Sequence, residues 1–221
     1  MLRVKICGLT RAEDAQLACE LGADAVGFIF YSQSPRSISM QAAAAIAEQL
    51  PAHVTRVGVF VDSPIEVIEA HRRAIGLQAL QFHGEYSAHE MAQFYSSRLI
   101  KVARLRDQSS LENLASFQNL AHAFLLDTYE KDKLGGTGKT FDWQLAIAAK
   151  QYGRIILAGG LNPLNVQEAV LLVQPYAIDV NSGVEAAPGI KDQHKLRQLF
   201  EQVKEFRRDG QSANATVFPV A

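Results

Sequence analysis

Residues 25–30 read Ala-Val-Gly-Phe-Ile-Phe, a continuous apolar run of the length of one β-strand. An unbroken run, without the alternation of a half-exposed strand, is typical of a parallel sheet that is covered on both faces. A turn at residues 22–24 precedes the run, and residues 11–20 before that turn carry a helical pattern. This stretch predicts an α/β protein in which strands and helices alternate.

The same alternation continues along the chain, with one strand-like run about every 25 residues. We expect strands at residues 2–6, 25–30, 54–61, 77–82, 99–103, 123–126, 154–158 and 177–180. Eight strand–helix units predict a closed (β/α)8 barrel, the TIM-barrel architecture, and a doubly wound open sheet is the alternative. No break in composition divides the chain, which favours closure. We assign residues 1–207 to this single domain and residues 208–221, which lack helical periodicity, to a flexible C-terminal tail.

Several helix starts are marked by residues whose side chains can accept a hydrogen bond from the first turn. The expected caps are Thr10, Ser39, Ser63, Ser87 and Asn162. The last long helix is expected over residues 192–207.

Composition narrows the classes of function. The chain has 221 residues, 48% of them hydrophobic, and a formal net charge of −1 without a long basic stripe, which argues against nucleic-acid and membrane-surface partners. Two cysteines do not make a disulfide scaffold at this length, and the N-terminus has no apolar signal-peptide core. We therefore expect a cytoplasmic protein. No extra strand or long apolar helix calls for a partner subunit, so a monomer is expected.

Cys7 follows the first expected strand directly and precedes Gly8, which begins a strand-to-helix turn. Reactive groups of α/β proteins lie at this kind of position, at the carboxyl end of a parallel strand. The alternative is that Cys7 is a small buried hydrophobic residue, as free cysteines often are.

Asp127 ends the short apolar strand at residues 123–126. A carboxyl group at this position becomes partly desolvated when a ligand binds, which raises its pKa and suits it to general acid catalysis. The alternative is that Asp127 only caps a turn.

The loops after the last two strands are rich in glycine and small residues. Gly159 and Gly160 follow one strand, and Asn181, Ser182 and Gly183 follow the other. Glycine lets backbone N–H groups approach an anion closely, and barrels recurrently hold a phosphate at these two loops. We expect a phosphate site here, although ordinary turns also need glycine.

The loop at residues 128–140 contains Lys-Leu-Gly-Gly-Thr-Gly-Lys at positions 133–139. Its spacing does not fit a Walker A phosphate loop. We interpret it as a mobile lid that closes over a ligand, and a solvated loop without a role is the alternative.

Arg36 and His83 are weaker candidates when each is taken alone. Arg36 suits bidentate recognition of a carboxylate, but it could be a solvated loop charge, and His83 could be a histidine of the barrel rim. The remaining histidines show no metal-ligand spacing, so no metal is expected.

Taken together, these motifs resemble the phosphoribosylanthranilate isomerase family. The matching motifs occur in the family's order across residues 2–206. They are Lys5-Ile-Cys-Gly-Leu-Thr10, Ser34-Pro-Arg-Ser37, Gln81-Phe-His-Gly84, Gly136-Thr-Gly-Lys-Thr-Phe-Asp-Trp143, Leu157-Ala-Gly-Gly-Leu161 and Asp179-Val-Asn-Ser-Gly-Val-Glu185. Phe82 and Asn181 depart from the family pattern, which has an aliphatic residue and a serine there.

The resemblance implies a TIM barrel of tryptophan biosynthesis. It implies conversion of N-(5-phosphoribosyl)anthranilate to 1-(2-carboxyphenylamino)-1-deoxyribulose 5-phosphate, an Amadori rearrangement without cofactor or metal. Cys7 would be the general base and Asp127 the general acid. Lys5 shares strand parity with Cys7, so both side chains can point inward, and we expect local dipoles or cations such as Lys5 to lower the Cys7 pKa. Contacts to this phosphorylated sugar-anthranilate substrate would come from Arg36, on its carboxylate, and from His83 and Asp179. The phosphate would lie against Gly159, Gly160, Ser182 and Gly183.

Two other functions stay open from the residues alone. One is a different sugar-phosphate barrel such as indole-glycerol-phosphate synthase, whose chemistry calls for a lysine and a glutamate at the strand ends. The other is a protein that binds a phosphorylated ligand without converting it.

Overall fold

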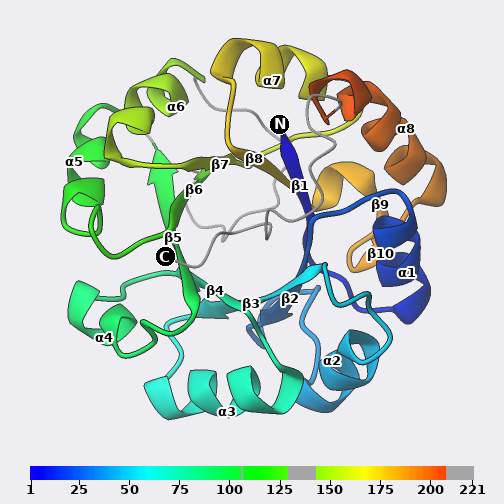
Figure 1. Cartoon of the computed structure of the whole chain (residues 1–221), viewed down its shortest axis with the longest axis horizontal. Coiled ribbons are helices and arrows are strands. Elements are labelled where there is room, and N and C mark those ends of the chain that lie inside the picture. Colours follow the sequence, from blue (N-terminus) through cyan, green and yellow to red (C-terminus); the bar gives the residue numbers. More distant parts are fainter. Residues whose placement is uncertain (106, 129–142, 208–221) are drawn as a thin grey trace.

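The computed structural model describes residues 1–105, 107–128 and 143–207. Eight parallel strands form a closed barrel in chain order, with the first strand paired to the last (Figure 1). The strands are β1 (Arg3–Ile6), β2 (Ala25–Phe30), β3 (Thr55–Val61), β4 (Ala79–His83), β5 (Arg98–Leu105), β6 (Ala123–Thr128), β7 (Ile155–Leu157) and β8 (Ala177–Val180). The predicted TIM barrel is confirmed, and the open sheet is excluded.

Helices surround the barrel as an outer ring (Figure 1). They are α1 (Ala12–Glu20), α2 (Met40–Ala47), α3 (Ile65–Ile75), α4 (Ala88–Ala92), α5 (Ser109–Ala115), α6 (Trp143–Ala149), α7 (Val166–Val173) and α8 (Gln193–Val203). Short 3-10 helices follow α6, β8 and α8: η1 (Lys150–Tyr152), η2 (Ser182–Val184) and η3 (Lys204–Arg207). The predicted tail at residues 208–221 lies outside the described residues.

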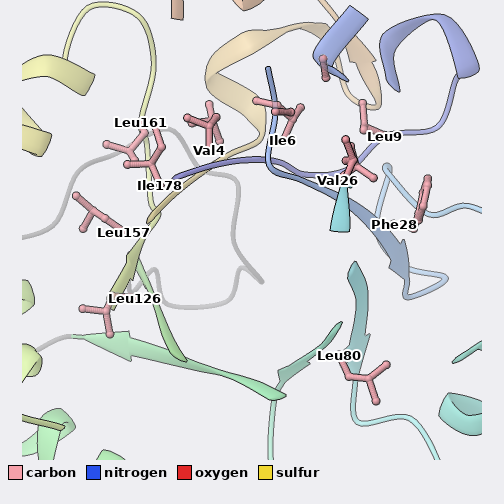
Figure 2. Packing of buried hydrophobic residues seen from close by; sticks show 14 of the residues in the cluster. Val4, Ile6, Leu9, Val26, Phe28, Leu80, Leu126, Leu157, Leu161 and Ile178 are labelled. Atoms are coloured by element: carbon pink, nitrogen blue, oxygen red, sulfur yellow. The ribbon is translucent and has the colours of Figure 1, made fainter. Parts of the chain in front are cut away.

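Side chains of the barrel wall alternate between two separate apolar layers, because successive residues of a strand point to opposite faces. Val4, Ile6, Val26 and Phe28 point outward and pack between the strands and the helices (Figure 2). The inward residues form the second layer: Ala25, Val57, Ala79, Ile100, Val102, Ala123, Leu125, Ile156, Ala158 and Ala177. Polar side chains of the same inward parity therefore lie above this layer, toward the ends of the strands.

Two of the expected helix caps are confirmed. The Ser39 hydroxyl accepts a hydrogen bond from the N–H of Ala42 at the start of α2. Ser87 and Glu90 form a reciprocal capping box at the start of α4.

The other three expected residues are not the N-caps of the helices that form. The side chains of Thr10 and Ser63 donate to the carbonyls of Gly189 and Val61 instead. Asn162 Oδ1 accepts the N–H of Leu164 at 2.8 Å, as a cap would, but these residues form a turn before α7, and Asn162 Nδ2 donates to the carbonyl of Gly160. The helices that follow begin after Arg11, Pro64 and Asn165.

A short antiparallel hairpin after β8 was not indicated by the strand pattern. It consists of β9 (Glu185–Ala187) and β10 (Ile190–Lys191) and lies beside α1 (Figure 1). The buried carboxylate of Asp14 in α1 accepts the backbone N–H of Lys191 at 2.9 Å, and Thr10 binds Gly189. The hairpin is thereby fixed next to the mouth of the barrel.

Candidate active site

Parallel strands end together at one mouth of a barrel, so residues just beyond them meet there. One pocket at this mouth has a volume of about 790 Å³, which includes its opening into solvent. Its lining includes Cys7, Arg36, His83, Asp127, Gly159, Gly160, Asp179 and Ser182. Of the predicted site residues, Gly183 alone is outside this lining. A Cβ at Gly183 would collide with the carbonyl oxygen of Leu161, so this glycine allows the loops after β7 and β8 to pack closely.

Gly27 in β2 makes room for Cys7. Its neighbours of the same parity point inward, and a Cβ built on it would lie 2.7 Å from Cys7 Sγ and 3.2 Å from Lys5 Nζ. The side chains of Lys5 in β1 and of Cys7 directly after β1 therefore point into the barrel, as the strand parity predicts. Gly27 was not singled out in the sequence, although a glycine within an apolar strand indicates a close approach.

Cys7 is buried and surrounded by opposing charges. Burial raises its pKa above the ordinary value, the ammonium of Lys5 lowers it by attraction and a hydrogen bond, and the carboxylate of Asp179 raises it. Lys191 adds a smaller lowering effect. The direction predicted for Lys5 is confirmed, but the predicted lowering of the Cys7 pKa is wrong here, because burial outweighs the cations.

Lys5 is almost completely buried and forms an ion pair with Asp179, with 2.9 Å between Nζ and Oδ2. The two residues are directly paired in the register of β1 and β8, which places both side chains in one inward layer. Burial lowers the pKa of Lys5, but Asp179 and Cys7 together raise it above its ordinary value. A charged ammonium is thus held beside the Cys7 sulfur.

Two buried oxygen atoms of the pocket lining have no hydrogen-bond partner among the described residues. They are Oδ1 of Asp179 and Oε1 of Gln81, and Gln81 is 4% exposed. Buried acceptors are normally satisfied, so both oxygens are suited to accept hydrogen bonds from a ligand. Gln81 was not among the predicted site residues. A polar residue of inward parity in an apolar strand was the signal available for it.

Asp127 lies at the carboxyl end of β6 and is 8% exposed. It lines the same pocket as Cys7, and three steps around the barrel wall separate their strands. The structure thus brings the two predicted acid–base residues to one site.

His83 lies at the end of β4 and interacts with the guanidinium of Arg104. Arg104 Nε and Nη2 lie 3.2 and 3.0 Å from His83 Nε2, which must accept because a guanidinium only donates. Burial, together with the positive charges of Arg104 and Lys101, lowers the pKa of His83 to about 4. The neutral ring therefore carries its proton on Nδ1, which is left as a hydrogen-bond donor of a residue that lines the pocket.

The depressed pKa of His83 predicts a loss of stability in acid. Unfolded histidine titrates near about 6.5, so the unfolded chain binds one more proton than the folded chain between about pH 6.5 and 4. The free energy of unfolding should fall over this range by up to about 3 kcal/mol. Urea unfolding of wild type and His83→Gln at pH 7 and 4.5 measures it. The glutamine variant should lose less stability, and equal losses would contradict the assignment.

Arg36, expected to be free for a substrate carboxylate, already binds a carboxylate of the chain. Its Nε and Nη2 donate to Glu185 at 2.8 to 3.1 Å, and Lys191 Nζ donates to the same carboxylate at 3.0 Å. Sequence reasoning missed Glu185 and Lys191, because nothing local to either residue indicates a contact with Arg36.

Backbone N–H groups are available in the loops after β7 and β8. Gly159 and Gly160 both have positive φ, at 78° and 72°, a conformation that favours glycine. The side chains of Asn162 and Asn165 hold the carbonyl of Gly160. No backbone hydrogen bond among the described residues uses the N–H groups of Gly159, Gly160, Ser182 or Gly183. These donors can serve an anion in the pocket.

Some sequence predictions fall outside these observations. The predicted lid at residues 128–140 lies, except for its first position, outside the described residues. Within the described ranges, no group of three or more histidine, cysteine, aspartate or glutamate side chains is arranged to hold a metal ion. The described helices also include none long and apolar enough to cross a membrane.

Comparison with known proteins adds a second line of evidence. The family model described as N-(5'phosphoribosyl)anthranilate (PRA) isomerase matches residues 4–202. The N-(5'-phosphoribosyl)anthranilate isomerase of Pelobacter propionicus is 46% identical over 209 residues, covering 95% of this chain and 99% of its own. That of Citrifermentans bemidjiense is 47% identical over 204 residues, covering 92% and 98%.

Solved structures agree with these relatives. Phosphoribosyl anthranilate isomerase from Thermotoga maritima superposes with a TM-score of 0.87 at 41% identity, over 93% of this chain and 100% of that one. A phosphoribosyl anthranilate isomerase in complex with reduced 1-(o-carboxyphenylamino)-1-deoxyribulose 5-phosphate gives a TM-score of 0.84 at 38% identity, with the same coverage.

Proposed function

This chain belongs to the N-(5'-phosphoribosyl)anthranilate isomerase family, and from that premise we propose how its own residues catalyse the reaction. The enzyme is an aldose–ketose isomerase of tryptophan biosynthesis, acting on a small phosphorylated substrate. It converts N-(5-phosphoribosyl)anthranilate to 1-(2-carboxyphenylamino)-1-deoxyribulose 5-phosphate.

Asp127 is the general acid in this proposal. Its carboxyl group donates a proton to the ring oxygen of the ribose, and the bond between that oxygen and C1 breaks. The nitrogen lone pair forms the C1=N bond of a protonated imine, which makes the hydrogen on C2 acidic. Support comes from the place of Asp127 at the end of β6, buried and in the lining of the pocket.

Cys7 is the general base that removes the C2 hydrogen. Its thiolate takes the proton, the C–H electrons form a C1=C2 bond, and the imine nitrogen becomes neutral. The resulting enolamine then tautomerises to the ketone. Lys5, held in place by Asp179, favours the thiolate against the cost of burial.

The remaining lining residues hold the substrate in this scheme. Arg36 binds the carboxylate of the anthranilate ring, and the free N–H groups of Gly159, Gly160, Ser182 and Gly183 bind the phosphate. Gly183 does not line the pocket and has no side chain, so its backbone N–H is the group through which it would contribute.

Sugar hydroxyls and the amine nitrogen need partners between these two ends of the substrate. Asp179 Oδ1 and Gln81 Oε1 can accept hydrogen bonds, and His83 Nδ1 can donate one. All three side chains line the same pocket as Cys7 and Asp127.

The single observation that carries the proposal is that one pocket is lined by both Cys7 and Asp127. Following the fluorescence of phosphoribosylanthranilate on addition of the wild-type chain tests it, with the product identified by mass spectrometry and chemical reduction. We expect first-order loss of the substrate signal with formation of the ketose. Thermal protection by the ligand without any conversion would instead identify a binding protein.

Two further expectations remain predictions of the sequence: the monomeric state and the cytoplasmic location. Sedimentation velocity at assay concentration tests the monomer directly.

A further inference from the structure

We propose that Glu185 is a positioning residue, which holds Arg36 so that a second edge of its guanidinium is directed to the carboxylate of the substrate. The proposal rests on the role proposed for Arg36 above. It assigns a task to a residue of β9 that lies outside the pocket lining.

The geometry of the Arg36–Glu185 pair leaves one edge of the guanidinium unused. Arg36 Nε lies 2.9 and 3.1 Å from Oε1 and Oε2 of Glu185, and Arg36 Nη2 lies 2.8 Å from Oε2. A guanidinium has five N–H donors in a rigid plane. The pairing with Glu185 uses Nε–H and one N–H of Nη2, so both N–H donors of Nη1 and the second N–H of Nη2 are not used by it. No hydrogen bond joins Nη1 to another described residue, and Arg36 lines the pocket. The Nη1–Nη2 edge can thus bind a second carboxylate in bidentate fashion.

Glu185 is itself held firmly in its position. Its side chain is 5% exposed and accepts from Lys191 Nζ at 3.0 Å and from the N–H of Gly189 at 3.2 Å. Burial acts to raise its pKa, but Arg36 and Lys191 together hold the pKa below the ordinary value. The carboxylate therefore stays charged and keeps Arg36 in one orientation.

Arg36, Glu185 and Lys191 form one charged cluster, and this cluster contacts the loop after β8 that is proposed to bind phosphate. Lys191 Nζ donates to the carbonyl oxygen of Asn181 at 3.2 Å and to Asn181 Oδ1 at 3.0 Å. Gly8 lies next to both Asn181 and Arg36, since a Cβ there would lie 2.6 Å from Asn181 Oδ1 and 3.0 Å from Arg36 Cδ. Asn181, which departs from the family pattern, thus uses its side-chain oxygen to bind Lys191 in this chain.

Charge explains why the arrangement should favour an anionic ligand. Arg36 and Lys191 carry two positive charges against the one negative charge of Glu185, and the cluster keeps a net positive charge beside the pocket. Without Glu185 the guanidinium would regain rotational freedom, which a ligand would have to restrict on binding. The loss should therefore appear in the binding of the ligand's carboxylate and not in the chemical step.

The test compares two ligands on the Glu185→Gln variant by calorimetry. One is the reduced product analogue, reduced 1-(o-carboxyphenylamino)-1-deoxyribulose 5-phosphate, and the other is its phenylamino counterpart without the carboxyl group. Loss of a charged hydrogen-bonded partner predicts binding about ten-fold or more weaker for the first ligand and little change for the second. In turnover, KM should rise more than kcat falls, because the interaction is made in the ground state and the transition state alike.

Glu69→Gln provides a matched control. Glu69 is also clamped by two arginines, Arg72 and Arg73, but it lies on α3 and does not line the pocket. This variant should bind both ligands as wild type does. Glu185→Asp keeps the charge but shortens the side chain, so it should show a smaller carboxylate-specific loss, and it allows the same comparison if the glutamine variant does not fold.

Arg36→Ala separates this inference from the proposal on which it rests. If Arg36→Ala weakens both ligands equally, the role of Arg36 itself is wrong, and the inference fails with it. If Arg36→Ala acts on the carboxylate ligand alone but Glu185→Gln weakens both ligands equally, Glu185 is only structural and the inference alone is overturned. We expect Glu185→Gln to add no carboxylate-specific loss in the Arg36→Ala background.

Discussion

Replacing Cys7 with alanine is expected to lower kcat by about a thousand-fold or more, because a positioned general base commonly contributes a factor of about 10² to 10⁴. The methyl group cannot accept the C2 proton, and no other thiol lines the pocket among the described residues. Binding of the reduced product analogue should stay within a few-fold of wild type. Fluorescence turnover and calorimetry measure the two effects separately.

Cys19→Ala is the matched control for Cys7→Ala. Cys19 is half-buried on α1, outside the pocket lining, and burial raises its pKa to about 11. Its replacement should leave turnover unchanged. A Cys7→Ala enzyme that turns over at the wild-type rate would remove Cys7 from the mechanism.

The raised pKa of Cys7 also gives the assignment a pH signature. A base whose pKa is raised by burial is mostly protonated at neutral pH, so its active thiolate fraction grows as the pH increases. The pH profile of kcat/KM reports on groups of the free enzyme, and in Asp127→Asn, which has no acid proton to lose as the pH increases, we expect its alkaline side to keep rising above pH 7. This rise should be absent from the residual activity of Cys7→Ala.

The barrel was predictable because its evidence is local. Apolar runs such as residues 25–30 are covered on both faces, and their spacing alone gives the number of strand–helix units. Parity then decides which residues point inward, so Lys5 and Cys7 could be placed on one face before the register was known. The same reasoning could have found Gln81 and Gly27, which share that inward parity.

The Arg36–Glu185–Lys191 cluster was not predictable in the same way. Arg36 and Glu185 are 149 residues apart, and only closure of the barrel between β1 and β8 brings their loops together. The misplaced caps have a related cause. Thr10, for example, bonds to Gly189 across the mouth of the barrel, and a local capping pattern cannot anticipate a competing partner that is distant in sequence.

Net pKa shifts were also beyond the sequence. The proximity of Lys5 to Cys7 could be inferred from parity, but the cost of burying the thiol depends on packing from several strands, including the space left by Gly27. The sequence thus indicated the correct partner for Cys7 and the wrong balance of effects on its pKa.

Replacing Asp127 with asparagine is expected to lower kcat by about a thousand-fold, since the amide keeps the shape of the side chain but has no acidic proton for the ring oxygen. Asp192→Asn is a matched control: Asp192 caps α8 away from the pocket, and asparagine caps helices about as well as aspartate. That variant should retain wild-type turnover.

Substrate carrying deuterium at C2 distinguishes the roles of Asp127 and Cys7. In our scheme the ring opens before the C2–H bond breaks. If Asp127→Asn slows ring opening, that step limits the rate and the isotope effect on kcat should fall toward one. A Cys7→Ser enzyme, with a poorer base, should show the full primary isotope effect, because proton removal limits its rate. A full isotope effect in Asp127→Asn would mean that Asp127 assists proton removal from C2, and the assignment of acid and base at this barrel mouth would have to be changed.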